Sequence, residues 1–380
     1  MRVALIGANG HGRWHRRAIA RLQAAGAVRL VGLCDLAPIR DEPDAPVPPG
    51  ARIFTDYREL LATVAPEVVV ICTPPHTHLE IATTAARAGA DLLLEKPPVL
   101  SLAEHEALAA VLAETGRVCQ VGFQALGSAA LAELTAAITA GRLGAVRAVS
   151  AVGGWQRPDS YYQRAPWAGR RWLAGRPVLD GALANPFAHA VMQTLAIAEA
   201  VTGAPVRIGN GGRRVELARY RARPIEVDDT AVVRLAGEPV LLVAVTLCAD
   251  EWVTPQVIVH GEAGQAILEY TEDRLRLPGD PAIRSVPGRT GLLENLLDHR
   301  AEAMPLLAPL ARTAPFTALV ETITAAPDPA PIGAIRAIGN GPDRVVTVPG
   351  ISRLLRRAAD ELALPSELGA AWAVPAYETR

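Results

Sequence analysis

Lys96 is the only lysine in the chain, and it stands two residues after the apolar run Leu92–Leu94. Lysine and arginine together number 38, so all the others are arginine. A lysine ammonium can stabilise a developing negative oxygen or, when desolvated, lose its own proton, whereas a guanidinium stays protonated up to a pH of about 12. Lys96 is therefore a candidate for proton chemistry that arginine cannot perform; the alternatives are a compositional accident and a lysine held only by Glu95.

A glycine-rich turn, GANGHG, follows the aliphatic run at the N-terminus and precedes a helical pattern. Gly7 and Gly12 match the first and third glycines of the GxGxxG dinucleotide fingerprint, and Asn9 takes the second position. The second glycine normally lets the backbone approach the pyrophosphate. Gly10 can take over part of that role, and asparagine tolerates left-handed backbone angles better than most residues. The turn therefore predicts dinucleotide binding; a glycine-rich turn without a ligand is the alternative.

Asp35 supports the cofactor prediction. It ends the second predicted strand, about 20 residues beyond the turn, where an acid accepts hydrogen bonds from the adenosine ribose. An acid at this position repels a 2′-phosphate, so the sequence favours NAD, although the nearby Arg40 leaves NADP open.

Strand-like runs alternate with helical segments over the first 123 residues. This alternation predicts right-handed βαβ units and a parallel sheet. Lys96 ends one of these strands, at the carboxyl edge where such folds bind ligands. The predicted strands are RVALIG, VRLVGLCD, a short run near 52–54, EVVVICTPP, DLLLEKP and RVCQVGF.

The pattern changes after Phe123. Helices are expected near 127–141 and 186–201, and β-rich segments without intervening helices fill 205–277, which indicates an antiparallel or mixed sheet. A stretch rich in proline and glycine, 326–350, precedes a final helix, ISRLLRRAADEL. The chain therefore divides into a first domain, 1–123, and a second, 124–380; two domains are also what 380 residues favour.

The composition excludes several function classes. A net charge of -1 offers no attraction to nucleic acid or to an anionic membrane. No apolar run approaches the ~20 residues of a membrane helix. The four cysteines form no close pair, so we predict reduced thiols, a cytoplasmic protein and no metal site.

The block VVICTPPHTHLEIATTAARAGADLLLEKPP, residues 69–98, resembles the glucose–fructose oxidoreductase / inositol dehydrogenase / MocA-like (Gfo/Idh/MocA) superfamily. Its members share a TPxxxH strand end, a helix ending in AG and the EKP tripeptide. The resemblance covers about 270 residues in order. It continues through VGF at 121–123, GRLGAV at 141–146, YYQRAPWAG at 161–169, NPFAH at 185–189 and EVDDTAVV at 226–233.

The resemblance implies a fold and an activity. The fold is α/β: an N-terminal Rossmann domain with a doubly wound parallel sheet, then a C-terminal α/β domain on an open, largely antiparallel sheet. The second domain would bind substrate, and its exposed sheet face would form a homodimer or homotetramer. The implied activity is NAD(P)-dependent hydride transfer at a hydroxyl-bearing carbon of a sugar, sugar derivative or cyclitol.

The resemblance also implies site residues. The catalytic lysine of EKP corresponds to Lys96, which would stabilise the alkoxide while an alcohol loses its proton and its hydride. An N-x-x-x-H motif supplies Asn185 and His189, whose spacing of four places both on one face of a helix. His189 would be the general acid or base, with Asn185 orienting the substrate; Asp180 lies out of step with the motif. The alternative for His189 is a hydrogen-bonded structural histidine. The implied cofactor-binding residues are Gly7, Asn9, Gly10, His11, Gly12, Asp35, Thr73, Pro74, His78, Glu95 and Lys96.

Several polar and aromatic positions allow more than one interpretation. His76 and His78 shape the loop after the third long strand, contact the cofactor, or simply lie on the surface. Pro97 forms either a cis or a trans turn after Lys96. Aromatic residues in 155–172, above all Tyr162 and Trp167, are candidates to bind a sugar face, against a loop that only packs on its domain.

Two further function classes stay open. The superfamily includes an NAD-binding transcriptional repressor, so a regulatory protein without turnover is one alternative; Lys96 and His189 argue against it. A redox-assisted glycosidase that keeps NAD bound is the other.

Overall fold

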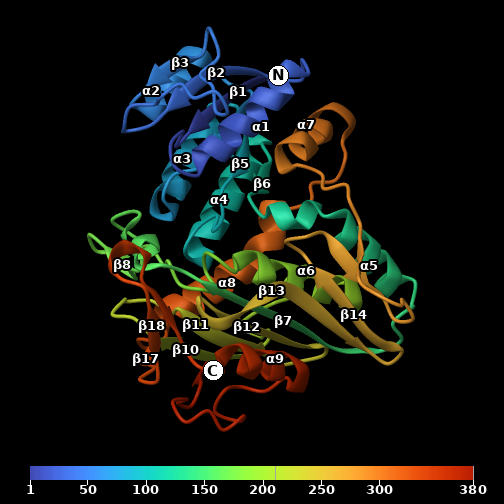
Figure 1. Cartoon of the computed structure of the whole chain (residues 1–380). Coiled ribbons are helices and arrows are strands. Elements are labelled where there is room, and N and C mark those ends of the chain that lie inside the picture. The colour runs from blue at the N-terminus through green and yellow to red at the C-terminus, as the bar shows by residue number, and fades with distance from the viewer. Residues whose placement is uncertain (210, 380) are drawn as a thin grey trace. The chain divides into compact units, whose positions relative to one another are not determined.

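The computed structural model describes residues 1–209 and 211–379, which form two compact units. The first contains Met1–Gly122 and Leu292–Thr317, and the second contains Phe123–Gly291 and Ala318–Arg380. Figure 1 labels their helices and strands. Among the described residues, no helix is long and apolar enough to cross a membrane.

The first unit is built on a six-stranded sheet in the order β3-β2-β1-β4-β5-β6, with every pairing parallel. Strands β2 and β3 are added on one side of β1, and strands β4 to β6 on the other side. This order is the doubly wound Rossmann arrangement. The fold prediction is therefore confirmed. The strands are β1 (Arg2–Ile6), β2 (Arg29–Cys34), β3 (Arg52–Phe54), β4 (Val68–Ile71), β5 (Asp91–Leu94) and β6 (Cys119–Val121).

Local sequence explains these elements. Strands β4 and β5 are buried along their whole length, as expected of central parallel strands that helices cover on both faces. Asp56 and Ser101 cap the helices that follow them by accepting backbone N–H groups. The helices are α1 (Gly12–Ala24), α2 (Tyr57–Val64), α3 (His78–Arg87) and α4 (Leu102–Thr115).

A distant segment completes this unit. Helix α7 (Leu292–Glu302) places four leucines in the core that also holds residues of β1, β2 and β4. The Gln120 carboxamide donates to Asn295 Oδ1 at 2.6 Å and accepts the Ala308 N–H at 2.9 Å. From the sequence, all of 124–380 was expected in the second domain. Residues 292–317 instead belong to the first unit, where apolar and amide contacts with the first sheet hold them.

The second unit contains a ten-stranded sheet in the order β16-β15-β14-β13-β7-β12-β11-β10-β17, with β20 also pairing to β10. Its pairings are antiparallel except β7 with β12 and β10 with β17, so the prediction of a largely antiparallel sheet is confirmed. The longer strands are β7 (Val146–Gln156), β10 (Val215–Arg221), β11 (Thr230–Leu235), β12 (Val240–Thr246), β13 (Cys248–Gly261) and β14 (Gly264–Glu269). The short ones are β8 (Trp172–Leu173), β9 (Arg176–Pro177), β15 (Arg274–Arg276), β16 (Arg284–Ser285), β17 (Ala330–Pro331), β18 (Arg336–Ile338), β19 (Val345–Thr347) and β20 (Tyr377–Glu378).

Helices cover both faces of this sheet. Helix α6 (Ala188–Thr202) begins after Phe187, whose ring lies so close to β7 that a Cβ on Gly153 would be 2.5 Å from it. Val152, the preceding residue of β7, points to the opposite face, where it joins a core that includes Ile351 and Leu355 of helix α9 (Ile351–Glu361). The other helices are α5 (Ala129–Thr139) and α8 (Ala314–Ala325).

The C-terminal residues are fixed firmly on that second face. Asp250 Oδ1 of β13 accepts the Ser352 N–H at 3.0 Å at the start of α9. Farther along, the Trp372 ring lies edge-on to Tyr220, with ring centroids 4.7 Å apart. The sheet has open edges, as predicted, but this face is covered by residues 350–378 of the same chain.

Candidate functional site

The glycine turn lies between β1 and α1, and its geometry requires two of its glycines. Gly7 has a φ of +87°, and a Cβ there would lie 2.4 Å from the Cys72 carbonyl oxygen. A Cβ on Gly12 would lie 1.9 Å from the Gly7 carbonyl oxygen. Only glycine fits such close backbone approaches, which explains why glycine stands at the first and third positions of the fingerprint.

Asn9 connects the turn to Asp35. Its backbone N–H donates to Asp35 Oδ2 at 2.9 Å, and its side-chain amide donates to the Ala37 carbonyl at 3.3 Å. The Ala37 N–H donates to Asp35 Oδ1 at 3.0 Å. Gly10 has a left-handed φ of +54°, whereas Asn9 is not among the residues with a positive φ. Each Asp35 oxygen has a second lone pair that a ribose hydroxyl can use.

His78 ties two loops together at the carboxyl edge of the first sheet. Its ring is fully buried, with Nε2 2.8 Å from the Thr73 carbonyl and Nδ1 3.0 Å from the Pro97 carbonyl. Burial lowers the pKa of this histidine, although the carbonyls act in the opposite direction. These contacts favour the loop-shaping interpretation of His78. Thr73 and Pro74 begin the same loop, and the Thr73 hydroxyl lies 2.7 Å from that of Thr77.

Glu95 is buried beneath this edge with both carboxylate oxygens oriented. Oε2 accepts the Lys96 backbone N–H at 3.1 Å, and Oε1 lies 2.9 Å from His15 Nε2 and 3.6 Å from His11 Nε2. Burial acts to raise the pKa of the Glu95 carboxyl, but hydrogen bonds from the two histidines hold it well below its usual range. A Cβ on Gly122 would lie 2.7 Å from the Glu95 carboxyl carbon, so Gly122 is a site residue that the sequence analysis did not identify.

Lys96 is partly buried at the carboxyl end of β5. The Lys96–Pro97 peptide bond is cis, which resolves the two alternatives that the sequence left for this turn.

In the second unit, Asp180 fixes the residues that precede His189. Its buried carboxylate accepts the Asn185 side-chain amide at 2.7 Å, Arg164 Nη2 at 2.6 Å and the Gly169 N–H at 3.0 Å. Asn185 lies in the turns before α6 and His189 in its first helical turn, so only His189 is on the helix itself. From the sequence, Asp180 was out of step with the motif. Its contact with Asn185 runs through a turn, where helical spacing is not required.

Asp228, in the EVDD segment, also contacts the turns before α6. It accepts Arg219 Nε at 2.8 Å and the Ala182 N–H at 2.9 Å, and both charged side chains are almost completely buried. Gly181 leaves room for this carboxylate, because a Cβ there would lie 2.7 Å from Asp228 Oδ1.

We expect Asp228→Ala to lower the free energy of unfolding by roughly 3–5 kcal/mol, because it leaves the Arg219 guanidinium buried without a counter-charge. Asp328→Ala is the matched control: Asp328 pairs with Arg171 at 2.8 Å but is 74% exposed, so its loss should cost under about 1 kcal/mol. Urea unfolding followed by tryptophan fluorescence measures both, since five of the six tryptophans lie in the second unit. Equal losses in the two variants would contradict the assignment.

The two aromatic candidates differ in their surroundings. Trp167 stacks with Arg164, whose guanidinium carbon lies 4.6 Å from the ring centroid. Tyr162 is mostly buried, which raises the pKa of its hydroxyl. Its ring helps to line a pocket of about 480 Å³. Other lining residues of this pocket include Gln163, Gly169, Arg170, Arg223, Glu226 and Arg344.

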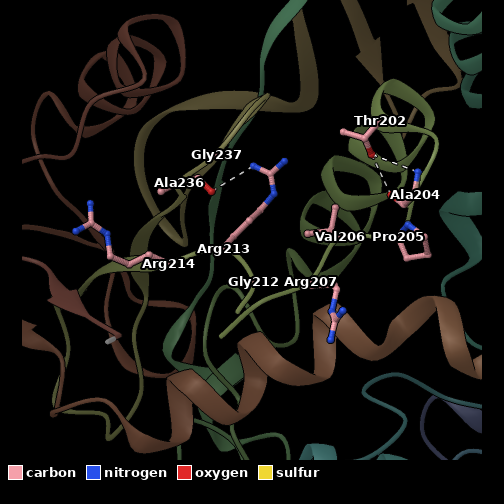
Figure 2. A pocket seen from close by; sticks show the side chains of 10 residues that line it. All are labelled: Thr202, Ala204, Pro205, Val206, Arg207, Gly212, Arg213, Arg214, Ala236 and Gly237. Carbon is pink, nitrogen blue, oxygen red and sulfur yellow. Dashed lines mark hydrogen bonds between the residues drawn. The ribbon is translucent and has the colours of Figure 1, made fainter. Parts of the chain in front are cut away.

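Figure 2 shows another pocket of the second unit, of about 450 Å³, which contains none of the predicted site residues. Arg207, Arg213 and Arg214 contribute to its lining. The Arg213 guanidinium is occupied by backbone carbonyls, those of Ala236 at 3.4 Å and Glu238 at 3.0 Å.

Comparison with known proteins identifies relatives of the chain. Residues 1–123 match the family model GFO_IDH_MocA, described as an oxidoreductase family with an NAD-binding Rossmann fold. The scyllo-inositol 2-dehydrogenase (NAD(+)) of Bacillus subtilis is 38% identical over 89 residues, which are 23% of this chain and 26% of that protein. The inositol 2-dehydrogenase of Rhizobium meliloti is 32% identical over 151 residues, 40% and 44% of the two chains. The chain thus matches well under two thirds of either relative.

The fold also has counterparts among solved structures. The WlbA dehydrogenase of Bordetella pertussis, solved with NADH and UDP-GlcNAcA, superposes with a TM-score of 0.67 at 23% identity. The superposition covers 86% of this chain and 95% of that one. At this identity the likeness establishes the fold.

Proposed function

We propose that this protein is an NAD-dependent dehydrogenase or reductase of sugars, sugar derivatives or cyclitols, because residues 1–123 match the model of an NAD-binding oxidoreductase family, GFO_IDH_MocA. The observation that supports this most directly is the turn in which Gly7 and Gly12 have no room for a Cβ, joined through Asn9 to the Asp35 carboxylate. Sugar and inositol dehydrogenases among the relatives support the substrate class.

The residues of the first unit fit NAD. The glycines leave the backbone of the turn accessible at the N-terminus of α1, where N–H groups and the helix dipole favour a pyrophosphate. Asp35 has lone pairs for the hydroxyls of the adenosine ribose. When bound, NAD accepts or supplies the hydride. The loops that begin at Thr73 and Lys96, tied together by His78, would border the nicotinamide end.

The protein's own residues would handle the proton. Lys96 would hold the reacting oxygen by charge and hydrogen bonding and stabilise the alkoxide, and His189 would take or return the hydroxyl proton. Asn185 would orient the substrate, because the Asp180 carboxylate fixes the direction of its side-chain amide. Tyr162 and Trp167 remain candidates for contacts to the substrate.

We expect the wild-type protein to bind NAD more tightly than NADP, and Asp35→Ser to narrow that difference by about tenfold, the equivalent of removing ~1.4 kcal/mol of repulsion toward the 2′-phosphate. Asp44→Ser is the control, because Asp44 lies in the same loop but pairs with Arg17 at the surface. Titration of each cofactor into apo protein measures the ratio. Tighter NADP binding by the wild type would overturn the preference.

Turnover decides the function itself. A panel of inositols, hexoses and nucleotide-linked sugars, each mixed with enzyme and NAD, should give NADH absorbance with at least one compound. Hydrolysis of a glycoside with no net NADH, by protein that retains NAD through purification, would instead indicate the redox-assisted glycosidase. Tight NAD binding without turnover on any compound would favour a regulatory protein.

A further inference from the structure

His11, His15 and Glu95 form a cluster in the first unit whose ligand atoms all lie within 4.8 Å of one another. Among the residues that the structure describes, it is the one group of three or more histidine, cysteine or acidic side chains with this spacing. In contrast to the sequence-based prediction of no metal site, we propose that this cluster is a binding site for a zinc-like divalent transition-metal ion. The proposal does not depend on the oxidoreductase activity.

The backbone brings the two imidazoles to one side of a helix. His11 is the N-cap residue of α1 and already has helical angles, with φ −65° and ψ −25°. His15 follows four residues later, about one turn along the same face. Their rings meet edge to face, with centroids 5.8 Å apart, and both Nε2 atoms are directed to the same carboxylate oxygen.

The third ligand arrives from the sheet with its orientation fixed. Glu95 follows β5, and its Oε2 accepts the Lys96 N–H, so that Oε1 faces the histidines at 2.9 and 3.6 Å. The missing side chain of Gly122 provides the space in which this carboxylate lies. Because this carboxylate is already oriented, it loses little conformational freedom when it binds an ion. Outer hydrogen-bond partners orient the ligands of known metal sites in the same way.

The ligand set and its spacing suit zinc. Two imidazoles and one carboxylate are ligands of the kind that hold zinc in metalloenzymes, at about 2.0–2.2 Å each. Tetrahedral bonds of that length separate ligand atoms by roughly 3.3–3.5 Å. Glu95 Oε1 lies 2.9 and 3.6 Å from the two histidine nitrogens, and all three ligand atoms lie within 4.8 Å of one another, so side-chain movements of about 1 Å would complete the site. Magnesium prefers six oxygen ligands, which this cluster does not offer.

Exposure leaves one side of the cluster accessible. The side chains of His15 and Glu95 are only 9% and 7% exposed, whereas that of His11 is 58% exposed. An ion can therefore enter past His11 and keep a water molecule as its fourth ligand. Bound there, it would join the first turn of α1 to the carboxyl end of β5.

The test uses full-length, NAD-free protein without a polyhistidine tag, titrated with Zn²⁺ by calorimetry, and with Co²⁺ to read coordination from its visible spectrum. We expect one equivalent to bind, a spectrum typical of four-coordinate cobalt, and a rise in Tm, because binding to the folded state stabilises it. His11→Ala should weaken binding by at least about 100-fold, the upper end of what loss of an outer partner alone costs. Mg²⁺ at the same concentration should have no effect.

His299→Ala is the matched control, since His299 is a histidine of the same unit whose Nδ1 lies 2.7 Å from the Met304 carbonyl, outside the cluster. It should bind Zn²⁺ like the wild type. His11 is exposed, so its replacement should not prevent folding, and circular dichroism checks this. No stoichiometric binding by the wild type, or equal affinity in the His11 and His299 variants, would overturn the proposal.

Discussion

Replacing His189 by alanine is expected to lower kcat by roughly 10²–10⁴-fold, the usual effect of losing a general acid–base, while NAD affinity stays nearly unchanged. His189 lies in the first turn of α6 in the second unit, whereas the proposed cofactor residues belong to the first. Its loss should therefore affect the proton step and leave the glycine turn and Asp35 intact. Steady-state kinetics on an accepted substrate, with a separate NAD titration, measures both quantities.

A second substitution separates catalysis from packing. The His189 ring also meets Phe123 edge to face at a centroid distance of 6.0 Å, so alanine removes a packing contact as well as an acid–base group. His189→Gln restores polar bulk without a titrating group. If glutamine recovers most of the turnover, or if the pH profile of kcat is the same in variant and wild type, His189 is a structural residue and its proposed role fails.

Lys96→Arg is expected to lower kcat by at least about 100-fold although it preserves the charge. The guanidinium is larger, planar and permanently protonated, so it cannot exchange a proton with the substrate oxygen. It would also enter the space that this oxygen needs, where about 1 Å of misplacement can cost ~100-fold. Lys96 is partly buried at the carboxyl end of β5, so a larger side chain has little open space there.

Lys96→Met is the companion variant, because it keeps an unbranched side chain and removes the charge. It should be no more active than the arginine variant, and both should still bind NAD. Wild-type turnover in Lys96→Arg would mean that the lone lysine is a compositional accident.

The sequence predicted most of the first unit because its signals are local. Each buried strand and the amphipathic helix after it lie within about 30 residues, and the requirement for glycine at Gly7 and Gly12 follows from the fingerprint. By contrast, Gln120 contacts Asn295 and Ala308, which lie 175 and 188 residues farther along the chain. No periodicity in 292–317 distinguishes packing on one sheet from packing on the other, so its place could not be predicted.

The candidate site shows the same division. Lys96, Asn185 and His189 were proposed from their motifs, while the contacts of Asn185 and of the loop at Lys96 were found only in three dimensions. Asp180 reaches Asn185 through a turn, and His78 acts on the backbone of two loops, a role that its identity alone does not reveal. Gly122 matters for the atom it lacks, and that becomes apparent only when the Glu95 carboxylate is placed beside it.

The C-terminal cover of the second sheet has a consequence for association between copies. A segment tethered to its own sheet has an effective local concentration in the millimolar range, far above that of a second chain at micromolar concentration. To use this face, another copy would have to displace α9, with Leu355 and Ile351 buried in the core, and release Trp372 from Tyr220. The homodimer or homotetramer expected from an exposed sheet face would therefore have to form through a different surface.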